Sequence, residues 1–548
     1  MGMKKADIVI SSDALFTGLT EKPTSGSIAV LDNKIIGVGS KTEIEHLIGN
    51  ETRILNYGNQ LIMPGFHDFH LHIMFGSLSI NSVNLSEAMS AEDVAKKVWE
   101  FSKECDEGEW IIGMQWDAGY WDDKQEPHYK ILDSMIPNQP VVLFHAEGHY
   151  TWVNSKAMSL AGISEDICDP SFGRFERDEN GLLTGILYEQ AQQMILKEAL
   201  KLTQSKKEAL LKKFLEMTAQ FGITSVNDLY TPIDDFIQDY SLYEKLDQQG
   251  QLTTRFHITP ELDGDLEKAK ILRDKYQSKN LQFSGLKQFV DGTVTGHTAY
   301  FLEPYSDQPD SYGHPALDAE ILVNRVIEAD KLGFRIRFHA IGDAAIHLAL
   351  DAFEQAIAKN GKRDSRHTIE HIEVLDPNDT ERFSKLGVMA SMQPDHMAAS
   401  SRDVYSAIIG PKRERNIFLA KNLLSSGAHL CLGTDYPISI SLNPMRQIYT
   451  AVTRIDNSGD PHNTWLPEQK LTIGEALQAY TAGPAHGCFR EHELGTIEVG
   501  KFADIIVLDR NLFEVPTHEI LETKVQLTMK DGNIVYEKKE VSISEPSS

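Results

Sequence analysis

The chain has 548 residues, and its 80 Asp and Glu residues outnumber its 53 Lys and Arg residues, so the formal charge is −27 at pH 7. This acidic balance disfavours phosphate backbones and anionic lipids, and no Lys/Arg block with interleaved aromatic residues is present, so neither nucleic acid nor a membrane is an expected partner. No stretch approaches the ~20 apolar residues of a membrane span and the first residues lack a signal-peptide core, which predicts a soluble cytoplasmic protein.

The two ends of the chain are predicted to be rich in β-structure. Residues 6 to 62 contain short alternating runs separated by turns, and residues 495 to 509 and 526 to 539 have the same alternation. We therefore expect one small composite β-sandwich domain, built from residues 1–63 and 488–548.

The middle of the chain, residues 64–487, alternates β-branched runs with amphipathic helices such as residues 205–222 and 342–361. This is the pattern of parallel strands joined by helical crossovers. Eight candidate strands can be assigned: residues 62–73, 222–229, 254–259, 286–292, 334–342, 366–374, 388–396 and 429–437. The predicted fold class is therefore α/β, with a (β/α)8 TIM barrel as the leading architecture.

The first two candidate strands are separated by far more chain than one crossover needs. Residues at about 74–204 are therefore predicted to form an insertion over the barrel mouth. The aromatic residues of this segment either wall an apolar pocket or form the insertion's own core. They are Trp110, Trp116, Tyr120, Trp121, Tyr150 and Trp152.

The four cysteines give no sign of a shared site. Cys105, Cys168, Cys431 and Cys488 lie far apart and form no CxxC pair. Neither a disulfide framework nor a thiolate zinc site is indicated. Cys431, in the same strand as Asp435, is predicted to be a small buried hydrophobe.

The strongest chemical signal is the pair His70 and His72, because a period of two puts both imidazoles on one side of the first barrel strand. Polar residues end four later strands: Lys287, His339, His371 and Asp435. Strand carboxyl ends converge on one face of such a barrel, and this donor set suits zinc, iron, manganese or nickel. His67 has the opposite parity to His70 and is expected to have a structural role.

Nine segments carry a resemblance to a known family. They are PGFHDFHLH (64–72), HAEGHYTWVNS (145–155), GITSVND (222–228), KQFVDG (287–292), FHAIGDAAI (338–346), IEH (369–371), GTDYP (433–437), TAGPA (481–485) and GTIEVGKFADIIVLD (495–509). On these segments the chain resembles the amidohydrolase superfamily over nearly its whole length, most closely the YtcJ-like branch, amidohydrolase family 3.

The resemblance implies the roles of the strand-end residues. The implied ligands of one or two divalent metal ions, with zinc expected, are His70, His72, His339, His371 and Asp435. Lys287 occupies the place where many relatives bridge two metals with a carboxylated lysine, whereas other branches use Glu, Cys or no bridge. The metal would supply a bound hydroxide as the nucleophile, with Asp435 as the catalytic base and then acid.

Three further residues are candidates for substrate binding: His149, Asp291 and Gln393. Each also has a plainer interpretation. His149 would be a surface histidine, Asp291 would form an ion pair with Lys287, and Gln393 would belong with Asp395 and His396 to a polar loop turned by Pro394.

The predicted function is a metal-dependent hydrolase that cleaves carbon–nitrogen bonds, other than peptide bonds, in an amide, N-formyl, N-acyl or cyclic amide small molecule. A deaminase or an ester or lactone hydrolase would use the same residues, and a metal-free relative would be a non-catalytic binding protein. A homodimer is expected only because cyclic dimers are the commonest assemblies.

Overall fold

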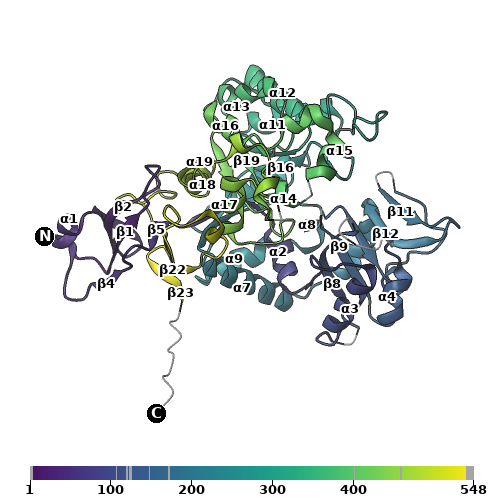
Figure 1. Ribbon diagram of the computed structural model, residues 1–548, viewed down its shortest axis with the longest axis horizontal. Helices are drawn as coiled ribbons and strands as arrows, with labels where there is room; N and C mark the ends of the chain where they lie inside the picture. Colours follow the sequence, from purple (N-terminus) through teal and green to yellow (C-terminus); the bar gives the residue numbers. More distant parts are fainter. Residues whose placement is uncertain are drawn as a thin grey trace, which may run out of the picture.

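The computed structural model describes residues 4–106, 108–118, 121, 126–146, 148–170, 173–399, 402–456 and 459–538. Along the longest axis of the molecule, a sheet at the amino terminus lies at one end and the sheet of the insertion lies at the other (Figure 1). The parallel strands and their helices lie between these two sheets. In the described part of the chain, no helix is long and apolar enough to cross a membrane.

The strands of the two chain ends form one mixed sheet. Its order is β23-β22-β21-β5-β1-β2-β3, with β4 paired to β1. The strands are β1 (Ile8–Leu15), β2 (Thr24–Leu31), β3 (Lys34–Gly39), β4 (Arg53–Asn56), β5 (Leu61–Pro64), β21 (Ile505–Leu508), β22 (Val525–Lys530) and β23 (Asn533–Glu537). Antiparallel pairing of β5 with β21 joins the two chain ends. Because the described strands make a single sheet, the two facing sheets of the expected sandwich are not confirmed.

Each predicted barrel strand contains an observed parallel strand. One sheet has the order β15-β14-β13-β6 and the other the order β16-β17-β18-β19-β20. The strands are β6 (Phe66–Leu71), β13 (Ile223–Leu229), β14 (Arg255–Thr259), β15 (Leu281–Phe283), β16 (Leu286–Phe289), β17 (Ile336–Ala340), β18 (Thr368–His371), β19 (Met389–Met392) and β20 (Leu430–Leu432). The short strand β15 is an addition that the sequence pattern does not predict.

Backbone hydrogen bonds link the two parallel sheets at both junctions. The amide of Asp435, just beyond β20, donates to the carbonyl of His70 in β6 at 2.6 Å. At the other junction the amide of Lys287 in β16 donates to the carbonyl of Pro260, just beyond β14, at 2.8 Å. The carboxyl ends of strands from both sheets are therefore held next to one another.

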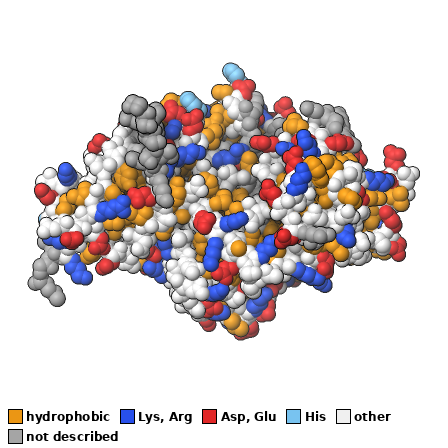
Figure 2. All heavy atoms as spheres, turned by 90° about the horizontal axis from the view of Figure 1, so that it is seen from below, with side chains coloured by type: hydrophobic (Ala, Val, Ile, Leu, Met, Phe, Trp, Pro, Cys, Tyr) orange, Lys and Arg blue, Asp and Glu red, His pale blue; other side chains and the backbone are white. Residues whose placement is uncertain are grey.

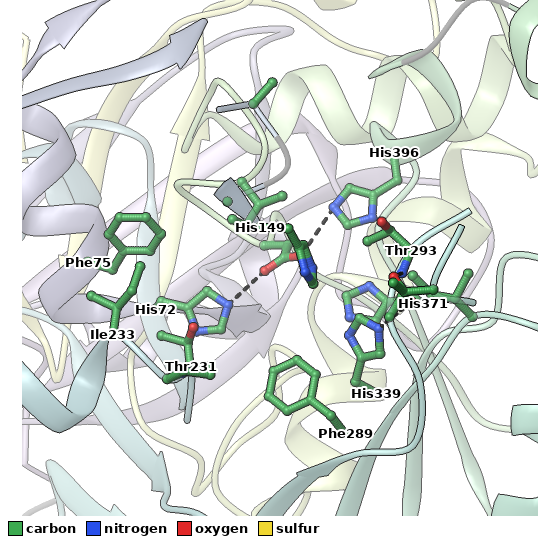
Figure 3. Close-up of a pocket in the computed structure, with 18 of the residues that line it drawn as sticks. His72, Phe75, His149, Thr231, Ile233, Phe289, Thr293, His339, His371 and His396 are labelled. Atoms are coloured by element: carbon green, nitrogen blue, oxygen red, sulfur yellow. Dashed lines mark hydrogen bonds and ion pairs between the residues drawn. The ribbon is translucent and has the colours of Figure 1, made fainter. Parts of the chain in front are cut away.

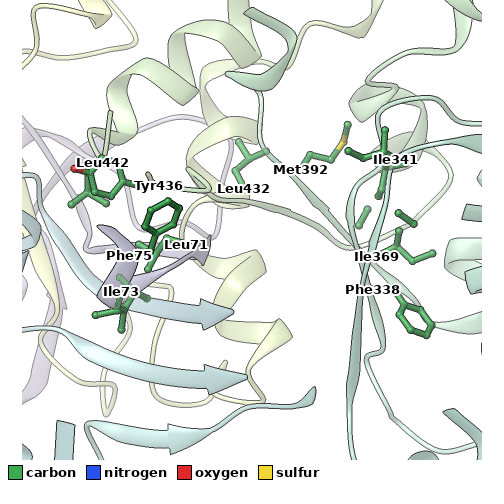
Figure 4. Packing of buried hydrophobic residues seen from close by; sticks show 14 of the residues in the cluster. Leu71, Ile73, Phe75, Phe338, Ile341, Ile369, Met392, Leu432, Tyr436 and Leu442 are labelled. Carbon is green, nitrogen blue, oxygen red and sulfur yellow. The ribbon is translucent and has the colours of Figure 1, made fainter. Parts of the chain in front are cut away.

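Long helices follow the parallel strands and bury their apolar faces against them. They include α7 (Gln204–Gln220), α11 (Ala319–Lys331) and α12 (Asp343–Asn360). Helix α7 begins after the side chain of Thr203 accepts the amide of Lys206, and the chain turns at Gly222 with φ +75°. In the core, Phe338 of β17 stacks on Phe353 of α12 with ring centroids 5.2 Å apart. Figure 4 shows Phe338 beside Ile369 of the neighbouring strand.

The insertion has a sheet and a core of its own. The sheet order is β11-β12-β10-β9-β8-β7, from β7 (Val83–Asn84), β8 (Ile111–Trp116), β9 (Val141–His145), β10 (Tyr150–Val153), β11 (Gly173–Arg177) and β12 (Leu183–Glu189). Trp116, Trp121 and Trp152 are buried together in this core. Of the six aromatic residues, Tyr120 lies outside the described residues, and the other five do not line the large cavity described below. The aromatic cluster is therefore the core of the insertion and not a pocket wall.

Charged side chains of both signs are interspersed on the face of the molecule in Figure 2. Among the residues described on this face, basic side chains do not gather into one continuous patch.

Candidate active site

The carboxyl ends of the parallel strands open into a cavity of about 830 Å³. Its lining includes all six predicted metal-site residues: His70, His72, Lys287, His339, His371 and Asp435. Figure 3 shows His72, His339, His371 and His396 turned toward the same space, with Phe75, Ile233 and Phe289 around it. The strand-end residues predicted from the sequence are thus brought together.

The rings of His70 and His72 are each held by one nitrogen. Nδ1 of His70 lies 2.8 Å from Oε2 of Glu370, and Nδ1 of His72 lies 2.6 Å from the carbonyl oxygen of Leu229. The Nε2 atoms lie 3.3 Å and 2.9 Å from Oδ1 of Asp435. An imidazole whose Nδ1 is bound to an oxygen acceptor directs Nε2 to its other side, here toward Asp435, which is the usual arrangement of a ligand histidine at metal centres.

His339 and His371 lie beside this pair. The His371 ring centroid lies 4.5 Å from that of His339 and 4.8 Å from that of His70. Burial and the charge of Lys287 hold the pKa of His339 well below its usual value, and burial and the neighbouring histidines do the same for His371. Both rings are therefore neutral, which is the form that binds metals.

The environment of Asp435 favours its ionised form. Burial opposes ionisation, but the charge of His70 and hydrogen bonds from His396, His70 and His72 outweigh it and hold the pKa of Asp435 well below its usual value. The backbone of Asp435 has φ +58°, and Oδ2 lies 3.2 Å from Nε2 of His396. The carboxylate therefore joins histidines from β6 to one from the loop after β19.

Lys287 is fully buried in the cavity wall with no acidic partner among the described residues. Burial lowers its pKa to about 8, against the opposing charges of Glu370 and Asp435. The ion pair with Asp291 that the sequence allowed is not formed. Asp291 instead accepts the backbone amides of Tyr300, Ile341 and Gly342, each at 2.9 Å.

The three substrate candidates have different positions. His149, from the insertion, lines the cavity, and its Nδ1 lies 3.0 Å from Oε1 of Glu189. Asp291 also lines the cavity, although its oxygens are occupied by the backbone amides named above. Gln393 does not line the cavity: it is buried, and its Nε2 lies 3.4 Å from Oγ of Ser391.

Two residues of the site were given no role from the sequence: Glu370 was not singled out, and His396 was named only as part of the loop after the seventh strand. Strand alternation puts Glu370 on the side opposite to its neighbour His371, yet its carboxylate contacts Nδ1 of His70. His396 follows Pro394 in what looked like an ordinary polar loop, but it begins α14 (His396–Ala399) and its ring stacks on His371 with centroids 5.3 Å apart. The sequence signals for these two residues were the glutamate of IEH (369–371) and the histidine of QPDH (393–396). Neither signal tells where the side chain points.

The donor set fits a divalent metal ion. Potential ligand atoms of His70, His72 and Asp435 lie within 4.8 Å of one another, and so do those of His371, His396 and Asp435. Nδ1 of His371 is buried and has no hydrogen-bond partner among the described residues. Neutral imidazoles beside an ionised carboxylate are the ligands that zinc and related ions prefer.

A family model described as "Amidohydrolase family" matches residues 53–536. The chain belongs to the amidohydrolase family. It is 29% identical to the putative amidohydrolase YtcJ of Bacillus subtilis, over 96% of this chain and 98% of that one, which confirms the resemblance seen in the motifs.

Other relatives also match along most of their length. The chain is 32% identical to Protein LONG AFTER FAR-RED 3 of Arabidopsis thaliana, over 97% of this chain and 92% of that protein. It is 26% identical to the N-substituted formamide deformylase of Arthrobacter pascens, over 97% of this chain and 98% of that protein. The crystal structure of an uncharacterized metal-dependent hydrolase from Pyrococcus horikoshii matches with a TM-score of 0.75 and 25% identity, over 93% of this chain and 99% of that one. The predicted α/β fold class is thereby confirmed.

Proposed function

We propose that this amidohydrolase is a metal-dependent hydrolase that cleaves a carbon–nitrogen bond, other than a peptide bond, in a small amide, N-formyl, N-acyl or cyclic amide compound. The observation that carries the proposal is the convergence of buried histidines, of which His339 and His371 are neutral, and an ionised Asp435 on one large cavity. The match to an N-substituted formamide deformylase over nearly the whole chain supports this substrate class.

Five residues would hold one or two divalent ions, with zinc as our expectation: His70, His72, His339, His371 and Asp435. When bound, such an ion lowers the pKa of a coordinated water to near neutrality and polarises a carbonyl oxygen. Glu370 and the carbonyl of Leu229 keep the Nε2 atoms of His70 and His72 directed at the ion.

Asp435 is the residue that would move the proton. Its carboxylate is ionised and lies at the cavity wall, so it can accept a proton from water and later pass it to the leaving nitrogen. His396, 3.2 Å from Oδ2, fixes the orientation of that carboxylate.

We further propose that Lys287 is carboxylated. Its pKa of about 8 leaves an appreciable neutral fraction, and a neutral amine adds carbon dioxide to form an N–C bond with release of one proton. An ammonium has no lone pair, whereas the resulting carbamate offers two anionic oxygens to two cations. Lys287 would then bridge two ions, as the family resemblance implies.

The cavity sets the size and character of the substrate. A volume of about 830 Å³ lies within the range of small-molecule sites. Phe75, Ile233 and Phe289 offer apolar surface, while His149 contributes a polar group from the insertion. We propose His149 as a substrate contact and Asp291 as a residue that shapes the wall through the backbone amides it accepts.

We also propose that the two parallel sheets close into the (β/α)8 barrel. Hydrogen bonds across both junctions support it: His70 with Asp435, and Pro260 with Lys287. Strand ends from both sheets would then share the single mouth to which the insertion contributes its polar residues.

The test combines metal analysis with a substrate screen. Metals per chain are measured before and after chelation and reloading, in the wild type and in His371→Ala and Lys287→Ala, with the exposed His518→Ala as the matched control. We expect His371→Ala to lose metal and more than about 100-fold of the activity on N-formyl or N-acyl compounds, because it removes a direct ligand. We expect Lys287→Ala to lose one of about two ions, and native mass spectrometry to show one carbon dioxide adduct that this variant lacks.

Each opposing outcome identifies a different error. Failure to bind metal under any loading would overturn the proposal and favour a non-catalytic binding protein. If the protein turns over esters, lactones or exocyclic amines and no amides, the proposed scissile bond is wrong, but the proposed metal site still stands. An unmodified Lys287 in fully metallated protein would contradict the proposed carboxylation, and the centre would then hold one metal ion.

A further inference from the structure

A second group of metal-ligand side chains lies outside the large cavity. It consists of His67 in β6, His257 in β14 and Cys488, which directly follows α19 (Ala482–Gly487). Their exposed fractions are 3%, 1% and 9%, and one potential ligand atom of each lies within 4.8 Å of the other two. None of the three lines the catalytic cavity, so the proposed hydrolase does not use them.

Both imidazoles of this group have one nitrogen satisfied and one nitrogen without a partner. Nε2 of His67 lies 2.8 Å from Oδ1 of Asn227, and Nδ1 of His257 donates to the carbonyl of Val226 at 3.2 Å. Nδ1 of His67 and Nε2 of His257 are buried and have no hydrogen-bond partner among the described residues. An unpaired buried nitrogen is costly, so Nε2 of His257 has unused capacity to bind a ligand; the nitrogen of His67 that lies near Cys488 is Nε2, which is 2.8 Å from Oδ1 of Asn227.

The separation of Cys488 and His67 is close to that of two ligands at a tetrahedral centre. Sγ of Cys488 lies 3.8 Å from Nε2 of His67. A tetrahedral zinc ion with bonds of about 2.3 Å to sulfur and about 2.1 Å to nitrogen separates such a pair by about 3.6 Å. Oδ1 of Asn227 lies 3.4 Å from the same Sγ, close to the sulfur–oxygen separation that a shared ion requires. Nδ2 of Asn227 also lies 3.4 Å from Sγ, so the hydrogen bonds that join the Asn227 amide to His67 and Cys488 would be exchanged for bonds to the ion.

The charges also suit a cation. Burial opposes ionisation of Cys488, but the charge and hydrogen bond of His67 and the guanidinium of Arg335 outweigh it and lower the pKa of the thiol to about 6. The thiolate is the form that binds metals. Burial and the charges of His67 and Arg490 hold the pKa of His257 well below its usual value, so its Nε2 carries a lone pair.

We propose that His67, His257 and Cys488, with the amide oxygen of Asn227 as a fourth donor, bind one divalent ion of the zinc type at a structural site. The ion would bond to Sγ and to the Nε2 atoms of the two histidines. His67 would carry its proton on Nδ1, one proton would leave the Cys488–His67 pair, and no electron would be transferred. Four protein donors leave no open position, which is the mark of a structural zinc site and not of a catalytic one.

This site would link elements that are distant in sequence. β6, β13 and β14 supply His67, Asn227 and His257, and the ion would hold the end of α19 against these strands. The proposed hydrolase centre contains no sulfur ligand, so a sulfur signal distinguishes the two centres.

The test uses the full chain reloaded with cobalt(II) in place of its native metal. A bond between cobalt and a thiolate gives a charge-transfer absorption in the near ultraviolet, which nitrogen and oxygen ligands do not give. We expect this band in the wild type and in His371→Ala, and we expect Cys488→Ser to lose it together with one metal ion per chain. Cys431→Ser is the matched control, because Cys431 is buried in the same small cluster as Cys488, and this variant should keep the band.

A second measurement does not depend on the folding of a variant. Zinc X-ray absorption of the untreated wild type should show sulfur in the first coordination shell of part of the metal. A shell of nitrogen and oxygen alone in fully loaded protein would overturn the proposal, and so would a cobalt–thiolate band that Cys488→Ser leaves unchanged. In either case the three residues would be a hydrogen-bonded cluster without metal, and the hydrolase proposal would stand.

Discussion

Glu370 holds the ring of His70, the first of the cavity histidines. Its side chain is fully buried between Nδ1 of His70, at 2.8 Å, and Nε of Arg337, at 2.6 Å. Burial opposes its ionisation, but the charges of Arg337 and His70 outweigh burial and hold the pKa of Glu370 well below its usual value. The carboxylate therefore stays ionised and keeps the proton of His70 on Nδ1.

Glu370→Gln is expected to weaken both stability and metal binding. It removes the negative charge beside Arg337, and an uncompensated buried charge costs about 3–5 kcal/mol. Loss of a carboxylate that supports a ligand histidine lowers metal affinity about 10–100-fold. Urea unfolding of the apoprotein and metal titration measure the two effects. Glu354→Gln, whose carboxylate is 61% exposed, is the control and should change neither; unchanged affinity in Glu370→Gln would mean that Glu370 does not position His70.

The residues that the sequence reveals are those whose direction follows from strand alternation. His70 and His72 share a side because they are two residues apart, and a strand end fixes where Asp435 must lie. His396 and Cys488 are different, because a turn and a helix end decide where these side chains point. The spacing of the four cysteines indicated no thiolate site, since the fold and not the sequence brings Cys488 to His67 and His257.

At the scale of elements, the parallel strands were predictable because strands buried on both faces appear as continuous apolar runs. β15 has only three residues and escapes such a search. The six-stranded sheet of the insertion was not predicted either, since its strands do not alternate regularly with helices as the barrel strands do. Hydrogen-bond partners are not encoded locally, so the division of the parallel strands into two sheets could not be predicted.

Asp330 is the acceptor that joins α11, α12 and β18. It accepts Nδ2 of Asn360 at 2.8 Å and Nε of Arg363 at 2.8 Å, and it lies 3.1 Å from Nε2 of His367. Burial would raise its pKa, but hydrogen bonds from His367 and Asn360 and the nearby positive charges lower it to about 2. His367, which directly precedes β18, therefore has a structural role in the core.

Asp330→Asn is expected to lower stability near neutral pH and to lose that effect in acid. The folded pKa of about 2 lies below the ordinary value of 3.8, so the ionised carboxylate stabilises the folded state above about pH 4 and the contribution disappears as the pH falls toward 2. A loss on the order of 1 kcal/mol is expected near pH 7. Urea unfolding at several pH values measures it, beside Asp274→Asn, whose side chain is 75% exposed. A difference between Asp330→Asn and wild type that does not narrow in acid would assign the effect to packing.

At the scale of the whole molecule, the sheet of the chain ends is attached to the parallel strands by a buried ion cluster. Arg255 of β14 is fully buried and forms ion pairs with Asp504, just before β21, and with Asp531, just after β22. Oγ1 of Thr528 in β22 donates to the carbonyl of Ala219 in α7 at 2.7 Å. The division of the chain into a composite end domain and a central domain stays a prediction, and these contacts indicate that the two unfold together.

Arg255→Ala is therefore expected to destabilise the whole chain. Asp504 would be left buried without its cation, at a cost of about 3–5 kcal/mol, whereas Asp531 would keep Nζ of Lys279 at 3.0 Å and Nζ of Lys530 at 3.2 Å. Arg53→Ala is the matched control, because the Arg53–Glu537 pair of the same sheet has side chains that are 49% and 46% exposed and should contribute less than about 1 kcal/mol. Denaturant unfolding compares the two variants, and hydrogen exchange shows whether β21 and β22 lose protection together with β14. If β21 and β22 open alone while β14 stays protected, the chain-end sheet is an independent domain, and the cluster connects two units that fold separately.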